Sequence, residues 1–167
     1  MPSPRIAREY KDQTVFISCT IQKWYYLFDR HNRWEILAKS LEYCQRHKDL
    51  KIFAYIFMLN HIHLLAQAPD MSRVLCDFKK YTSRELMKNI LLAEPHVAEL
   101  FPQKNGKFKI WQETNCPIII ESEKFFLQKQ QYIHENPVRK QYVENPEYWY
   151  WSSANPTQPL KITNGFE

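Results

Sequence analysis

The fold follows from one hydrophobic stretch, Tyr55-Ile56-Phe57-Met58-Leu59-Asn60-His61-Ile62-His63-Leu64-Leu65. β-Branched and aromatic residues dominate on both sides of Leu59-Asn60, so the sequence predicts strands over residues 51–58 and 61–67 joined by a tight turn. Side chains alternate between the faces of a strand, which places His61 and His63 on one face. Two imidazoles about 7 Å apart can reach one divalent metal ion; paired histidines on a wet strand face are the alternative.

The sequence around this stretch predicts a β-α-β-β-α-β order. Residues 13–21 and 117–121 are rich in β-branched residues and are expected as the first and last strands. Apolar residues recur at helical spacing over residues 32–47 and 72–92, with Asn32 as the N-cap of the first helix. The sequence therefore predicts an α+β fold with a ferredoxin-like antiparallel sheet and helices packed on one face.

An added C-terminal helix is expected to cover the open face of that sheet. It begins after Ser122 as a cap and ends near Glu135, because the residue before Pro137 avoids helical geometry. Tyr132 and Asn136 lie four residues apart and share one face of this helix. Tyr132 could then approach a metal ion held by His61 and His63, with Asn136 supplying an oxygen ligand.

Composition narrows the classes of function. The chain has 167 residues, 44% of them hydrophobic, which excludes a disordered tail, and its net charge of +5 favours a polyanionic partner. Only two glycines occur, so P-loop and Rossmann phosphate loops are excluded. Four scattered cysteines favour reduced, buried thiols over a zinc knuckle or a disulfide framework. Without a signal-like or membrane-spanning segment, we expect a cytoplasmic protein with no membrane partner.

Basic residues indicate where DNA would lie. The expected DNA-binding set consists of cations on the second helix and cations just after the tyrosine helix: Lys79, Lys80, Arg84, Lys88, Arg139 and Lys140. Exposed aromatic rings can stack unpaired bases, a role open to Tyr148, Trp149 and Trp151, with core packing as the alternative. We divide the chain into a basic arm (1–11), a catalytic domain (12–154) and a C-terminal tail (155–167).

The histidines and the tyrosine suit transesterification at a phosphodiester. A phenol is a weak nucleophile at neutral pH, so attack on phosphorus needs a metal ion on the phosphate oxygens. Tyr81, on the basic second helix, is the competing nucleophile. Tyr132 is preferred because Asn136 follows it by one helical turn.

Several ordered motifs resemble one family. The runs are Phe57-Met58-Leu59-Asn60-His61-Ile62-His63-Leu64-Leu65, Tyr132-Ile133-His134-Glu135-Asn136-Pro137-Val138-Arg139, Trp111-Gln112 and Trp151-Ser152-Ser153. Together, over residues 12–154, they resemble the single-tyrosine HUH transposases, most closely the REP-associated tyrosine transposases. Two departures are Leu59, where that family usually has proline, and Glu113-Thr114-Asn115-Cys116, which lacks the family's aromatic and basic pattern.

The resemblance implies a ferredoxin-like nuclease that uses Mg²⁺ or Mn²⁺. Such enzymes nick single-stranded DNA beside a hairpin through a 5′-phosphotyrosine and leave a free 3′-hydroxyl for strand transfer. It implies that His61 and His63 bind the metal, that Tyr132 attacks and that Asn136 is a third ligand. A monomer and a homodimer both remain open.

Two other functions remain as alternatives. One is a non-catalytic nucleic-acid-binding protein of the same fold, a domesticated transposase. The other is a metal-dependent hydrolase of a small phosphoester, which is less favoured because Asp70 is the nearest acidic residue downstream of the histidines.

Overall fold

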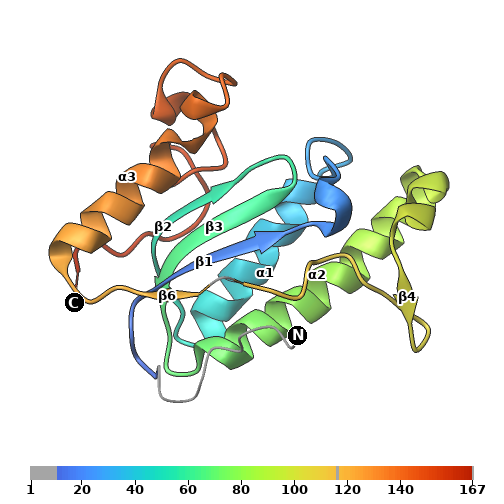
Figure 1. Cartoon of the computed structure of the whole chain (residues 1–167), viewed down its shortest axis with the longest axis horizontal. Coiled ribbons are helices and arrows are strands. Elements are labelled where there is room, and N and C mark those ends of the chain that lie inside the picture. The colour runs from blue at the N-terminus through green and yellow to red at the C-terminus, as the bar shows by residue number, and fades with distance from the viewer. Residues whose placement is uncertain (1–10, 116, 167) are drawn as a thin grey trace.

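The computed structural model describes residues 11–115 and 117–166 (Figure 1). Apart from Lys11, the predicted basic arm lies outside the described residues. The central sheet has the order β2-β3-β1-β6, formed by β1 (Val15–Thr20), β2 (Lys51–Phe57), β3 (His61–Gln67) and β6 (Ile118–Ile119). Each neighbouring pair is antiparallel. The predicted α+β class and antiparallel sheet are confirmed, and β3 is an interior strand.

Three long helices cover the sheet on its two faces. They are α1 (Arg33–His47), α2 (Met71–Ala93) and α3 (Glu123–Arg139). Ile62 and Leu64 of β3 belong to one core cluster with Leu41 of α1 and Phe78 of α2. Leu65 faces the other way and packs in a second cluster with residues of α3, including Phe126 and Ile133. Figure 1 shows α1 and α2 on one side of the sheet and α3 near β2.

The turn between β2 and β3 agrees with the prediction. Met58 N donates to His61 O at 2.8 Å, which closes the turn over Leu59 and Asn60. A bulge at Phe53 shifts the register of β2 between Ile52 and Ala54. The bulge lies away from the histidines, so His63 remains paired with Ile56 on one side and with Ser18 of β1 on the other.

Two helix ends differ from the prediction. α3 does not stop before Pro137 but continues to Arg139: the proline removes one helical hydrogen bond, but Asn136 and Pro137 are buried, so packing holds this last turn. Asn32 precedes α1 as expected, but its side chain makes no capping bond, since its backbone adopts the left-handed conformation with φ 57°. Ser122 caps α3 as predicted: its Oγ accepts a hydrogen bond from Phe125 N at 3.2 Å.

The outer edge of β2 is covered by the C-terminal part of the chain. Phe57 N donates to Trp151 O at 2.8 Å, Ser153 N to Tyr55 O at 3.0 Å, and Thr163 N to Ile52 O at 2.8 Å. Leu160 is buried in the core cluster on the α1 side. The backbone groups of this edge are therefore satisfied within the chain.

The remaining elements are short. They comprise the 3₁₀ helices η2 (Gln22–Trp24), η3 (Pro95–Leu100) and η4 (Pro146–Tyr148) and the hairpin strands β4 (Gln103–Lys104) and β5 (Lys107–Phe108). The hairpin stands beyond the end of the sheet, beside α2 (Figure 1). None of the helices in the described parts of the chain is long and apolar enough to cross a membrane.

Candidate active site

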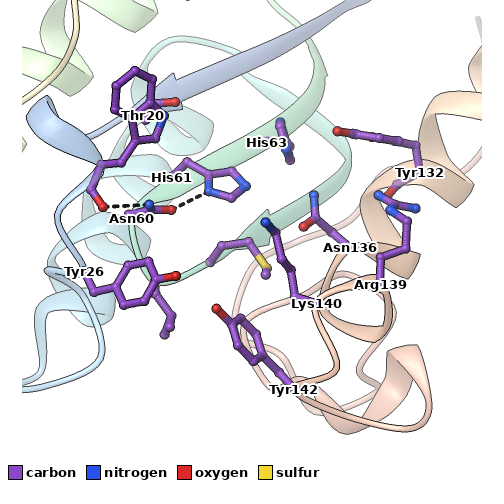
Figure 2. Close-up of a pocket in the computed structure, with 13 residues that line it drawn as sticks. Thr20, Tyr26, Asn60, His61, His63, Tyr132, Asn136, Arg139, Lys140 and Tyr142 are labelled. Atoms are coloured by element: carbon purple, nitrogen blue, oxygen red, sulfur yellow. Dashed lines mark hydrogen bonds between the residues drawn. The ribbon is translucent and has the colours of Figure 1, made fainter.

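A cleft of about 510 Å³ lies between β3 and α3, over the face of the sheet that α1 and α2 leave open. Its walls come from the end of β1, the turn before β3, the segment around η2 and the end of α3 (Figure 2). The lining residues that carry polar or charged groups include Thr20, Asn60, His61, His63, Tyr132, Asn136, Arg139 and Lys140. All four residues predicted for catalysis and metal binding thus line one cleft.

His61 and His63 lie side by side on β3, with their ring centroids 4.8 Å apart. Nδ1 of His61 lies 2.7 Å from Oδ1 of Asn60. An amide oxygen only accepts, so His61 donates from Nδ1 and keeps the lone pair of Nε2 available. Nδ1 of His63 is likewise engaged, 2.7 Å from the hydroxyl of Ser18. Each ring is thus oriented through Nδ1, which is how metal-binding histidines are commonly held.

Both imidazoles are neutral at neutral pH. Burial and the nearby Lys140 lower the pKa of His61 to about 4. Burial, followed by the charges of His61, Arg139 and Lys129, lowers the pKa of His63 to about 3. A neutral imidazole nitrogen is the form that binds a metal ion.

Tyr132 faces the histidines of its own chain. Its ring centroid lies 5.5 Å from that of His63 and 5.9 Å from that of Phe16, edge to face in both cases. Figure 2 shows its hydroxyl pointing toward His63. The next residue, Ile133, is fully buried against the sheet and fixes the rotation of α3.

Two cations flank the Tyr132 ring. The guanidinium carbon of Arg139 lies 4.4 Å from the ring centroid, and its Nη2 donates to Tyr132 O at 2.8 Å. The Lys129 ammonium lies 5.4 Å from the same ring. These groups place positive charge beside the ring of Tyr132.

Asn136 completes a donor set that fits a divalent metal. It lines the cleft one helical turn after Tyr132 and is only 5% exposed. Within the described part of the chain, no other residue hydrogen-bonds its side-chain amide, which is open to the cleft. The described residues contain no group of three histidine, cysteine or acidic side chains that could hold a metal, so an amide oxygen is the available third ligand. Two imidazole nitrogens and one oxygen suit Mn²⁺ or Mg²⁺ only with further oxygen ligands.

The predicted DNA-binding residues are separated into two places. Arg139 and Lys140 line the cleft. The four cations of α2 line a second groove, of about 740 Å³, between α2 and the β4–β5 hairpin. That groove also receives Lys107 and Lys109 and has Phe108 and Trp111 in its walls. Glu85 partly offsets the charge there, lying 3.3 Å from Arg84 and 3.0 Å from Lys88.

A backbone hydrogen bond at the end of β1 links a residue of the groove to a residue of the cleft. Gln112 lines the groove, and its backbone N donates to the O of Thr20, which lines the cleft, at 2.8 Å. The Gln112 side chain donates to Ile21 O at 3.2 Å, and Trp111 Nε1 donates to Thr82 Oγ1 of α2 at 2.9 Å. The Trp111-Gln112 pair therefore ties β1 to α2 and joins the two sites.

Other predicted residues lie elsewhere. Tyr81, the competing nucleophile, lies on α2, where the Arg84 guanidinium carbon is 5.5 Å from its ring, and it does not line the cleft. Trp149 and Trp151 pack against Trp34, with ring centroids 5.9 and 6.2 Å away, as in the core-packing alternative. Tyr148 is exposed but does not line the cleft.

His134 has a different place from the other motif residues. Its Nε2 bonds the hydroxyl of Ser153 at 2.7 Å, and burial lowers its pKa. It therefore attaches α3 to the segment that covers β2 and does not enter the cleft.

Sequence reasoning missed several residues of the cleft. Trp24, Tyr26 and Tyr142 line it, and Lys129 lies beside Tyr132. The aromatic run Trp24-Tyr25-Tyr26 was a visible signal, but nothing local shows that Trp24 and Tyr26 line the same cleft as the histidines.

Comparisons with known proteins show the family and the fold. A family model described as "Transposase IS200 like" matches residues 10–136. The structure of a REP-associated tyrosine transposase bound to a REP hairpin is similar in fold, with a TM-score of 0.64 and 19% identity over 93% of this chain and 90% of the other. A protein from Deinococcus radiodurans R1 classed with the transposases gives a TM-score of 0.46 and 22% identity over 78% and 95%. No curated protein matches the chain.

Proposed function

Since the chain belongs to the IS200-like transposase family, we propose that it nicks single-stranded DNA and transfers the strand through a covalent link to Tyr132. One observation carries this proposal: Tyr132 and His63 of the same chain face each other with ring centroids 5.5 Å apart, in a cleft lined by cations. A protein that only binds DNA needs neither the oriented histidines nor a tyrosine directed at them.

In the proposed reaction the Tyr132 oxygen attacks the phosphorus of the scissile phosphodiester. A bond from phosphorus to this oxygen forms, the bond to the 3′ oxygen breaks, and the phenolic proton is released while the 3′ oxygen leaves as a hydroxyl. The 5′-phosphotyrosine retains an ester bond, so a 3′-hydroxyl can later attack it and join the strands. Arg139 and Lys129 offset the charge on the phosphate throughout.

The reaction is proposed to depend on Mg²⁺ or Mn²⁺ held by Nε2 of His61, Nε2 of His63 and the amide oxygen of Asn136. The neutral imidazoles support this assignment, as does the Asn136 amide, which lines the cleft and is bonded by no side chain or backbone group of the described residues. When bound there, such an ion would draw charge from the non-bridging phosphate oxygens and orient the phosphorus for in-line attack.

We assign hairpin DNA to the groove and its unpaired flank to the cleft. The rim of the groove carries Lys79, Lys80, Arg84, Lys88, Lys107 and Lys109. Such cations bind the phosphates of a stem without reading its sequence. Because Gln112 of the groove is bonded to Thr20 of the cleft, the two sites are close enough for us to propose that one DNA molecule occupies both. A REP hairpin is the ligand of the structurally similar transposase, which supports a hairpin here.

The test is formation of a covalent adduct. Incubation of the full chain with Mn²⁺ and hairpin oligonucleotides carrying unpaired flanks should give a protein–DNA species that survives denaturing electrophoresis. Tyr132→Phe should abolish that species, because phenylalanine has no nucleophilic oxygen, and it should leave DNA binding within about twofold. Tyr81→Phe is the matched control and should form the adduct normally.

Two results would contradict the proposal. An adduct formed by Tyr132→Phe would exclude Tyr132 as the nucleophile. DNA binding without any adduct, across many hairpins and with either metal, would instead identify a non-catalytic DNA-binding protein of this fold.

A further inference from the structure

Three large aromatic side chains at the cleft are strongly exposed. Trp24 is 67% exposed, Tyr26 52% and Tyr142 39%, and all three line the cleft that holds His61 and Tyr132. Figure 2 shows Tyr26 and Tyr142 extending from opposite sides with their hydroxyl groups facing. Rings of this size usually bury about 150–250 Å² each, so exposed rings gathered in one cleft indicate a ligand with flat apolar faces.

The backbone holds Trp24 in an outward position. Lys23 and Trp24 both have left-handed backbones, with φ 58° and 52°, a region that residues other than glycine seldom occupy. Two hydrogen bonds fix this turn: Trp24 N donates to Ile21 O at 3.1 Å, and Asn60 Nδ2 donates to Trp24 O at 2.9 Å. Strain of this kind persists where the surrounding structure fixes it, often at functional sites.

Asn60 connects the Trp24 turn to the candidate metal site. Its Nδ2 donates to Trp24 O, while its Oδ1 accepts from Nδ1 of His61. The backbone of Trp24 is therefore held by the same side chain that orients His61.

Tyr142 is held from behind by other rings. It stacks on Trp149 with the centroids 5.6 Å apart and the planes at 24°, and Trp149 meets Trp34 edge to face at 5.9 Å. Trp149 Nε1 also donates to Phe57 O at 2.9 Å. A ring supported in this way is pre-organised, so a ligand gains contact with little loss of side-chain freedom.

We propose that Trp24, Tyr26 and Tyr142, here called the aromatic mouth, stack the unpaired bases that adjoin the phosphate held at the histidines and Tyr132. This inference rests on the proposed function and adds to it a means of selecting unpaired DNA. Bases in a duplex stack on each other and cannot present both faces to protein rings, whereas bases of a single strand can. Arg139 and Lys140 line the same cleft and bind the phosphates between those bases.

The experiment measures DNA affinity in the full-length Tyr132→Phe chain with Mn²⁺, by fluorescence anisotropy. The probes are hairpin oligonucleotides whose unpaired flanks carry mixed bases, and the same hairpins with abasic flanks. Trp24→Ala and Tyr142→Ala should each weaken binding to the base-bearing probes on the order of tenfold, and Trp24→Phe should lose less. With abasic flanks the parent and the two alanine variants should bind with equal affinity, because no base is left to stack on the rings.

Tyr43→Ala is the matched control, because Tyr43 is 56% exposed on α1 and lies outside the cleft. It should bind both probes like its parent, and thermal unfolding should show that every variant is folded. If Trp24→Ala and Tyr142→Ala bind base-bearing flanks as tightly as the parent, or lose equally with abasic flanks, the aromatic mouth does not stack bases. The adduct assay is independent of this test. If the parent chain forms the adduct but the alanine variants keep their affinity, only this inference is overturned. If no adduct forms but the variants lose affinity as expected, only the proposed chemistry is overturned.

Discussion

At the residue scale, Asn60 combines two roles that one pair of substitutions can separate. Its Oδ1 accepts from Nδ1 of His61, and its Nδ2 donates to the O of Trp24. Removing such a supporting bond from a metal-binding histidine commonly weakens the metal site by about 10–100-fold. We therefore expect Asn60→Ala to weaken Mn²⁺ binding by about that factor, as measured by titration with electron paramagnetic resonance.

Asn60→Asp is the informative partner of that variant. Aspartate keeps an oxygen to accept from His61 but has no N–H to donate to Trp24. It should bind Mn²⁺ at least as well as the parent while losing affinity for unpaired DNA flanks, like Trp24→Ala. Equal Mn²⁺ affinity in Asn60→Ala and its parent would show that the Asn60 bond does not support the metal site.

At the scale of elements, the start of α1 is joined to the end of α2 by an ion pair between a buried arginine and a partly exposed glutamate. Nη2 of Arg33, a fully buried residue, lies 2.8 Å from Oε2 of Glu94, and Arg30 Nε lies 2.9 Å from Oε1. Although burial opposes it, the two guanidinium groups lower the pKa of Glu94. The two helices that support the sheet from behind therefore depend on one carboxylate.

Glu94→Gln should destabilise the protein by about 3 kcal/mol at neutral pH, because it leaves the charge of Arg33 buried without its partner. The pKa of Glu94 is lower in the folded state than the ordinary 4.5. The stabilisation that the Glu94 carboxylate gives is therefore full above pH 4.5 and is lost as the pH falls through the folded pKa. Urea unfolding should show parent and variant converging below about pH 4.5. Glu85 pairs with the exposed Arg84 and Lys88, so Glu85→Gln should change the free energy of unfolding by no more than about 0.5 kcal/mol at every pH.

The elements that could be predicted are those formed by residues close together in the sequence. The spacing of hydrophobic residues predicts α1 and α2, and together with the turn at Leu59 and Asn60 it predicts the β2–β3 pair. Periodicity also put His61 with His63, and Tyr132 with Asn136. The prediction for the end of α3 was wrong, because the burial of Asn136 and Pro137 depends on contacts with other elements that a local pattern does not contain.

The aromatic mouth and the basic groove could not be predicted, because both arise from contacts between distant segments. Trp24 lines the cleft, and its left-handed backbone is held there by a bond from Asn60, which comes from a distant segment. The groove forms only because the β4–β5 hairpin stands beside α2. Sequence patterns describe faces of single elements, and these sites lie between elements.

At the scale of the whole molecule, the path of the C-terminal segment bears on how many chains make one active site. Backbone bonds from Phe57, Tyr55 and Ile52 to residues 151–163 occupy the outer edge of β2, which leaves that edge unavailable to a second chain. Tyr132 already lies beside His63 of its own chain. We therefore propose a monomer whose tyrosine acts on a phosphate bound by its own histidines.

Mixing two inactive variants distinguishes this arrangement from a dimer that exchanges α3. Tyr132→Phe lacks the nucleophile, and a double variant, His61→Ala with His63→Ala, lacks the candidate metal ligands but keeps Tyr132. If each site is built within one chain, the mixture should form no more adduct than either variant alone, because neither chain holds both halves of the site. Exchange of α3 between chains would instead restore adduct up to about a quarter to a half of the parent level, carried by the histidine variant. Sedimentation equilibrium on the parent should agree, giving a single species with the 20.3 kDa mass of one chain.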